Sequence, residues 1–160
     1  MVSHYQQNAN MKKILGIVVL GLLLSGNAYA AGVNGLKGLK DFDLEVRINE
    51  ECGVTTELIK NSIKYILSSS KIKLKELSAS VLFLDAVVMD DPTGCSGHYS
   101  LSVHEWHSTE NSANELVLAV LLLWDDSSTL KGAPDGFSRR FITSIENATK
   151  KFVVDWSEKN

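Results

Sequence analysis

The feature that most constrains the fold is an abrupt change of hydrophobic period early in the chain. Residues 41–48 alternate strictly between apolar and charged side chains, which is typical of a strand with one buried and one solvated face. Further on, Thr55 is a favourable N-cap, and Glu57 lies in the first turn, where a carboxylate stabilises a helix. An amphipathic helix that ends at Ser68 to Ser70 is therefore predicted. Its apolar face consists of Leu58, Ile59, Ile63, Ile66 and Leu67.

Three later segments have strand character. Residues 80–89 are rich in Val and Leu on both faces, as in a central strand, and residues 99–103 alternate as in a half-buried one. Residues 115–124 are apolar throughout: their leucines would suit a buried helix, but their short length and the polar turns on both sides favour a strand. Turn chemistry predicts a loop over residues 90–97, and the alternation of residues 71–75 fits a short strand or the approach to one.

A second amphipathic helix is predicted near the C-terminus, after Pro134-Asp135-Gly136. Its apolar stripe consists of Phe141, Ile142, Ile145, Ala148, Phe152, Val153 and Trp156. We interpret Trp156 as a structural anchor that seals the end of the core, because chain ends fray unless a buried group holds them. The element order is β-α-β-β-β-α. This order predicts an α+β fold, with a four-stranded, antiparallel-rich sheet and two helices packed on one face.

The first 30 residues have the three parts of a secretory signal peptide. Lys12 and Lys13 precede the apolar run 14–24, and Ala28-Tyr29-Ala30 supplies small residues for cleavage. The apolar run is shorter than the roughly 20 residues that a membrane anchor needs. Asn27 stands where a lipoprotein would carry its lipid-bearing cysteine, so no lipid attachment is expected.

Cleavage near Ala30 would leave residues 31–160 as a single exported α+β domain, periplasmic or secreted, soluble and without a stable membrane anchor. Residues 1–30 would then be an N-terminal extension plus the signal peptide, with Met11 as the expected true start. The exported part has 14 basic and 19 acidic residues, a net charge of −5. A mildly acidic chain lacks the basic face that nucleic acid requires, so no nucleic-acid partner is expected.

The two cysteines, Cys52 and Cys95, both lie in the exported part and are separated by 43 residues. An oxidising compartment favours a structural disulfide, whereas a redox-active pair would more often be Cys-x-x-Cys. The predicted topology supports the pairing. A crossover that makes the first and second strands parallel brings their ends to the same edge of the sheet, and each cysteine follows one of those ends.

The polar residues form no recognisable catalytic or metal-binding motif. His104 and His107 would face opposite sides of a strand, and His98 and His104 would lie about 20 Å apart, so a shared metal is not expected. Asp90-Asp91 and Asp125-Asp126 read as solvated strand ends rather than a cation site. No nucleophile elbow, phosphate-binding glycine loop or zinc helix is present. No cofactor is predicted.

One face of the sheet is expected to remain uncovered, because two helices suffice for only the other face. Val81, Val87 and their neighbours would then be exposed there. The candidate binding face consists of Phe83, His98, His104 and Trp106. The alternative is that loops, residues 31–40 or a second subunit cover it.

Three short segments resemble a group of small exported bacterial proteins of unknown function. They are Leu36-Lys37-Gly38-Leu39, Gly53-Val54-Thr55-Thr56-Glu57-Leu58, and Phe152-Val153-Val154-Asp155-Trp156 with the terminal Asn160. The element order is also similar to envelope accessory domains such as the lipopolysaccharide-assembly lipoprotein and the amino-terminal domain of the Tol system's propeller protein. This resemblance implies partner binding rather than catalysis.

The expected function is therefore that of a non-catalytic accessory module, which binds an envelope protein or an apolar ligand. Two alternatives stay open: a small secreted hydrolase whose site is assembled only by folding, and a purely structural homodimer.

Overall fold

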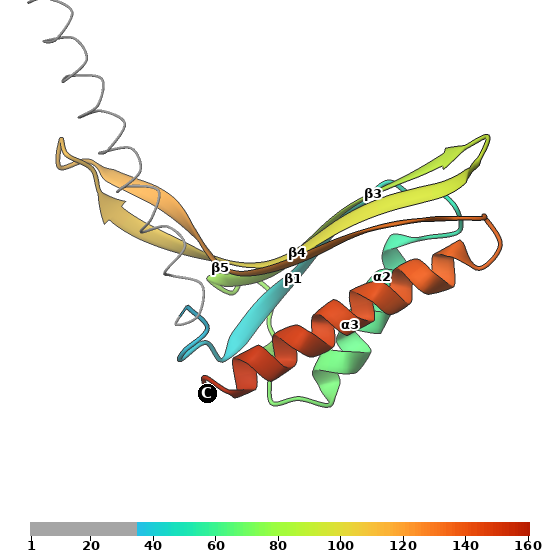
Figure 1. The fold of residues 1–160 in the computed structure, drawn as a ribbon. Helices are drawn as coiled ribbons and strands as arrows, with labels where there is room; N and C mark the ends of the chain where they lie inside the picture. The colour runs from blue at the N-terminus through green and yellow to red at the C-terminus, as the bar shows by residue number, and fades with distance from the viewer. Residues whose placement is uncertain (1–34) are drawn as a thin grey trace, which may run out of the picture. The chain divides into compact units, whose positions relative to one another are not determined.

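The computed structural model describes residues 35–160, which build two helices and five strands. In chain order these are β1 (Asp41–Ile48), α2 (Thr56–Ser68), β2 (Lys73–Leu74), β3 (Ser80–Asp91), β4 (Gly94–Glu110), β5 (Leu116–Gly132) and α3 (Phe137–Ser157). The strands form one sheet in the order β2-β1-β3-β4-β5, and both helices lie on the same side of it (Figure 1). The predicted α+β class is confirmed. The predicted four-stranded sheet lacked one strand, the two-residue β2.

The pairing directions follow the connections. β1 is parallel to β2 and to β3, with α2 in the crossover, whereas β3 with β4 and β4 with β5 are antiparallel and joined by hairpins. The described residues belong to one compact unit, Asn34–Asn160. Between residues 35 and 160, no helix is long and apolar enough to cross a membrane. The signal sequence predicted over residues 1–30 lies outside the described residues.

The first crossover begins as the sequence predicts. Thr55 is the N-cap of α2, and its hydroxyl accepts a hydrogen bond from the Leu58 backbone nitrogen at 3.3 Å. The helix buries Ile59, Ile63, Ile66 and Leu67. Leu58 is a correction to the predicted apolar face, because it lies at the edge of that stripe and is 47% exposed.

The predicted disulfide between Cys52 and Cys95 is confirmed, with a Cα–Cα distance of 6.3 Å. It joins the loop that follows β1 to the start of β4, at the end of the sheet where the parallel strands β1 and β3 both finish. The Asn49 side chain also connects β1 and β3 at this end of the sheet. Its Oδ1 accepts from the Val88 nitrogen at 2.8 Å, while its Nδ2 donates to the Val88 carbonyl.

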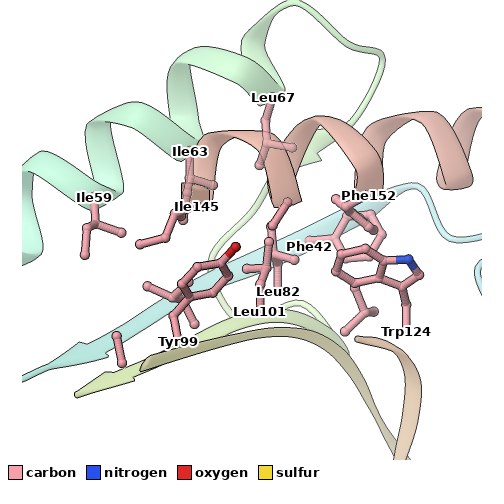
Figure 2. Packing of buried hydrophobic residues seen from close by; sticks show 14 of the residues in the cluster. Phe42, Ile59, Ile63, Leu67, Leu82, Tyr99, Leu101, Trp124, Ile145 and Phe152 are labelled. Atoms are coloured by element: carbon pink, nitrogen blue, oxygen red, sulfur yellow. The ribbon is translucent and has the colours of Figure 1, made fainter. Parts of the chain in front are cut away.

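The core lies between the helices and the covered face of the sheet (Figure 2). The Phe152 ring of α3 is central. Its centroid lies 5.4 Å from that of Phe42, edge to face, and 5.3 Å from that of Trp124. The Tyr99 hydroxyl donates to the Ser144 carbonyl at 3.0 Å, which satisfies the polar end of a buried ring. Burial raises the pKa of the Tyr99 phenol.

The C-terminus is tied back to the segment before β1. Trp156 is only 7% exposed, and its Nε1 donates to the Leu39 carbonyl at 2.8 Å. The side chain of Asn160 donates to the Leu36 carbonyl at 2.8 Å and accepts from the Gly38 nitrogen at 2.6 Å. These bonds span more than a hundred residues and hold both ends of the described chain at one place.

Two polar segments differ from their predictions. One was predicted as a loop and the other as the end of a strand, but both lie largely within strands. β3 runs through Asp91 and β4 starts at Gly94, so the predicted loop over residues 90–97 is reduced to the turn at Pro92-Thr93. Asp91 and Gly94 define this turn, since the carboxylate accepts from the Thr93 nitrogen and Gly94 has a φ of 136°.

β5 likewise continues through Asp125-Asp126 and Ser127-Ser128 to Gly132. Polar residues are tolerated there because β5 is an edge strand with solvent beside it. Asp126 also forms an ion pair with Lys151 of α3 at 3.3 Å.

We predict that replacing both Cys52 and Cys95 with Ala lowers the free energy of unfolding by about 4 kcal/mol, because the unfolded chain regains the freedom of an open loop. Urea denaturation of the oxidised wild type and of the double variant measures this difference. Ser112→Ala, in the exposed hairpin, should leave the midpoint unchanged. Equal midpoints for the wild type and the cysteine variant would contradict a stabilising role.

Trp156→Ala should lower the free energy of unfolding by about 3–5 kcal/mol, because it opens a cavity and removes the bond to the Leu39 carbonyl. Lys159→Ala, outside the apolar stripe, is the matched control and should change little. Thermal unfolding of the three proteins measures the effect. A Trp156→Ala variant that melts like the wild type would show that this residue does not anchor the core.

Candidate functional site

No described element covers the face of the sheet opposite the helices (Figure 1). This face carries exposed apolar side chains. On β3 the side chains alternate: Leu82 and Leu84 point to the helices and are fully buried, whereas Val87 and Met89 are about half exposed, at 49% and 55%. We call this uncovered side the open face.

A hollow of about 240 Å³ lies on the open face. Its lining comes from β1, β3 and β4, and consists of Glu45, Arg47, Val81, Phe83, His104 and Trp106. The Arg47 guanidinium carbon lies 5.2 Å from the centre of the Phe83 ring, within the range of a cation–π contact. The Phe83 and His104 rings are tilted against each other, with 5.8 Å between their centroids. We call this site the aromatic hollow.

Strand register brings these residues together. Glu45 is opposite Phe83 across the parallel β1–β3 pair, and Val81 is opposite His104 across the antiparallel β3–β4 pair. Trp106 is held next to them, since its backbone nitrogen donates to the Ala79 carbonyl at 3.1 Å. Val81 itself is only 7% exposed, so the exposed apolar surface of the hollow comes largely from Trp106, which is 47% exposed.

From the hollow onward, β4 and β5 continue as a two-stranded ribbon, which β3 joins only at its base, at His104 and Glu105, and which extends away from the helices (Figure 1). We call residues 104–122 the β4–β5 ribbon. Its β5 half is apolar and exposed on both faces: Leu116 is 78% exposed and Leu118 67% on the open face, and Leu121 is 46% exposed on the other. The hairpin at its tip is polar and ordered, because the Asn111 side chain accepts from the nitrogens of Ala113 and Glu115.

A β-bulge at Leu123 separates the ribbon from the body of the sheet. Trp124 is opposite Val103 but Leu122 is opposite His104, which leaves Leu123 without a partner. The extra residue shifts the alternation by one. Leu123 and Trp124 are therefore both buried, while Leu122 and Val120 lie on the open face beside His104 and Trp106.

Three of the four candidate binding residues, Phe83, His104 and Trp106, lie together in the aromatic hollow. His98 does not. It lies farther along β4, opposite Val87, and its Nδ1 is 3.1 Å from the Thr129 hydroxyl. The exposed leucines of the β4–β5 ribbon were missed as site residues, because an uninterrupted apolar run is typical of a buried strand and does not reveal that the helices end before the strand does.

The polar groups near the hollow do not form a nucleophilic triad. His104 Nε2 is 3.1 Å from the Ser102 hydroxyl, but Ser102 is only 5% exposed and its Oγ also lies 3.4 Å from the Phe83 carbonyl. Within residues 35–160, no carboxylate is hydrogen-bonded to His104. His107, on the opposite face, is the histidine that has an acid partner, Glu105 Oε2 at 3.0 Å.

A second hollow, of about 320 Å³, contains two carboxylates, those of Asp43 and Glu76. Lys60, Lys64 and Lys75 line it as well, and Asp43 accepts a hydrogen bond from the Leu77 nitrogen at 2.9 Å. Asp43 therefore holds the turn before β3. Among the described residues, one group of three side chains of the kinds that bind metals lies close together: Cys52, Asp90 and Cys95. The two sulfurs of this group are joined in the disulfide, so they are not thiolate ligands.

No protein-family model matches the chain, and no curated protein matches it.

The exposure of Trp106 gives a spectroscopic prediction, because Trp124 and Trp156 are each only 7% exposed. Acrylamide should quench the wild-type fluorescence in two components, and Trp106→Phe should remove the strongly quenched one. Trp124→Phe is the control and should leave that component in place. A strongly quenched component that survives in Trp106→Phe would contradict an open hollow.

Proposed function

We propose that this chain is a non-catalytic accessory module of the bacterial envelope, exported to the periplasm or secreted, which binds a partner protein on its open face. The observation that carries the proposal is the aromatic hollow and its continuation into the exposed side chains of the β4–β5 ribbon. The binding residues would be Phe83, His104 and Trp106, extended by Val120 and Leu122.

The composition of this surface suits protein recognition. Exposed Trp and Arg side chains are frequent energetic centres of interfaces, and here Arg47 and Trp106 line one concave site. Covering apolar surface contributes about 25 cal/mol per Å², so partly exposed residues such as Trp106, Val120 and Leu122 retain free energy for binding. A protruding side chain of apolar or aromatic character would fill the hollow, with Glu45 and Arg47 as a polar rim.

The proposed location is supported by two features. The pattern over residues 11–30 is typical of the signal peptides that direct export, and the Cys52–Cys95 disulfide is of the kind that persists in oxidising compartments. The resemblance to small exported bacterial proteins supports the same proposal.

A secreted hydrolase is the rival, and the Ser102–His104 contact is the observation that favours it. A hydrolase needs a nucleophile that substrate reaches and a base that a third group orients. Ser102 is buried, and its contacts are with the Phe83 carbonyl and the His104 ring. These contacts favour a role for the pair in holding the His104 ring against Phe83.

Site-specific photo-crosslinking in the exporting cell tests the proposal. A photoreactive amino acid in place of Glu45, which is exposed and lines the hollow, should form adducts with another envelope protein. The same amino acid in place of Tyr65, 80% exposed on α2, should not form these adducts. Adding Trp106→Ala should abolish the Glu45 adducts, whereas Val154→Ala, on the exposed side of α3, should leave them.

Two outcomes would overturn the proposed function. One is the same set of adducts from the Glu45 and Tyr65 positions, which would show that the open face has no special partner. The other is the absence of any adduct with a different protein at the Glu45 position.

A further inference from the structure

The outer edge of β5 is the longest unpaired strand edge among the described residues. β5 ends the sheet order, so along its 17 residues every second backbone N–H and C=O points outward, without a partner strand. An unpaired edge of this length is a template for another strand. Natural edge strands are usually protected by charged side chains, prolines or bulges.

The two halves of this edge differ in such protection. From Asp125 to Gly132 the strand has Asp125, Asp126 and Lys131, which make strand addition unfavourable. From Leu116 to Leu122 it has no charge and no proline, and six of these seven side chains are exposed hydrophobics. The unprotected half is therefore confined to the β4–β5 ribbon.

We propose that a second copy of this chain pairs with this unprotected half, β5 against β5, antiparallel and two-fold symmetric about Ala119. The inference deepens the proposed function, on which it rests, because the pairing joins two open faces into one binding surface. The sequence of this half argues for a second copy, because its apolar residues are self-complementary in an antiparallel register. It also has no charge, so two copies, whose net charges of −5 otherwise oppose association, can pair here without like charges opposite each other.

Symmetry restricts the register. In an antiparallel pair, opposed residues share a face, so a two-fold axis perpendicular to the sheet must pass beside one residue. An axis at Ala119 places Leu116 opposite the partner's Leu122, Val117 opposite its Leu121, and Leu118 opposite its Val120. All the opposed side chains between residues 116 and 122 are then apolar.

The neighbouring registers are worse. An axis at Val120 places Glu115 opposite Asp125, and like charges that face each other across two strands are destabilising. An axis at Leu118 places Leu121 and Leu122 opposite residues 115 and 114 of the polar hairpin, so fewer apolar pairs form.

The proposed pairing enlarges the open face. Leu116, Leu118, Val120 and Leu122 of each copy lie on that face, next to each other across the new strand pair, with Trp106 of each copy behind them. The aromatic hollows remain accessible because the contact uses the strand edge. A partner protein would then meet one continuous surface with two hollows.

A charge-placement experiment tests both the contact and its register. In the proposed pairing, residue 118 is opposite residue 120 of the partner. Leu118→Lys with Val120→Lys opposes two pairs of like charges. Leu118→Lys with Val120→Glu changes the same positions and opposes two pairs of unlike charges. The wild type should be a dimer by analytical ultracentrifugation, and the Lys/Lys variant should dissociate about tenfold or more readily than the Lys/Glu variant.

Cysteine crosslinking tests the symmetry axis. Ala119→Cys should form a disulfide between copies, because directly opposed strand residues lie about 4.5–5.5 Å apart between Cα atoms, within the range of a disulfide. Ser127→Cys, exposed on the same strand, is the matched control. Its two copies would be sixteen positions out of register, about 54 Å apart, and should not crosslink. Peptide mapping should find the new link beside an intact Cys52–Cys95 bond.

A monomeric wild type would overturn the inference, as would a dimer with equal stability in the two charge variants or one that crosslinks equally at residues 119 and 127. These failures are distinguishable from failure of the proposed function. A monomer that still forms Glu45 adducts with another protein keeps the function and excludes the dimer. A dimer without such adducts keeps the inference and excludes the function.

Discussion

The mismatch in length between α3 and the strands that it covers determines where this protein exposes apolar surface. A 21-residue helix is about 32 Å long, whereas a 17-residue strand spans about 58 Å. α3 packs its buried stripe, from Phe137 to Trp156, against the half of the sheet that extends from Gly97 on β4 to Trp124 on β5. The strands β4 and β5 must therefore extend beyond their cover, and the aromatic hollow and the β4–β5 ribbon lie where this cover ends.

The elements that depend on interactions between residues close together in the sequence could be predicted. The strand β1 has the predicted bounds, and α2 has the predicted cap, because alternation and capping depend only on residues a few positions apart. The disulfide could be predicted as well, since the crossover fixes which strand ends meet. The C-terminal half of β5, from Asp125 to Gly132, could not be predicted as a strand. Asp125 to Ser128 have the composition of a turn, and only the position of β5 at the sheet edge makes them strand residues.

The candidate site was predictable only in part, for a related reason. Phe83, His104 and Trp106 meet because β3 and β4 pair directly, a relation that the predicted hairpin contains. His98 was included because it shares a face with His104, but six residues of strand separate the two by about 20 Å. Which of the exposed side chains from Leu116 to Leu122 lie on the open face depends on the bulge at Leu123. That bulge changes which residues face the helices, and it has no local signal in an uninterrupted apolar run.

β4 connects the two opposite ends of the sheet, and these ends differ in how firmly they are held. At one end, Cys95 is linked to Cys52, and Asn49 makes two hydrogen bonds with the Val88 backbone. At the other end, about 37 Å along the strand, Trp106 makes the last backbone hydrogen bond of β4 toward this side, to Ala79, which directly precedes β3. Regions with few buried contacts open at the lowest free energy, so the ribbon should be the least stable part of the described fold when it is unpaired. A second copy on the outer edge of β5 would therefore stabilise the ribbon, and a partner protein on the open face would cover its exposed side chains, while the disulfide end would remain unchanged.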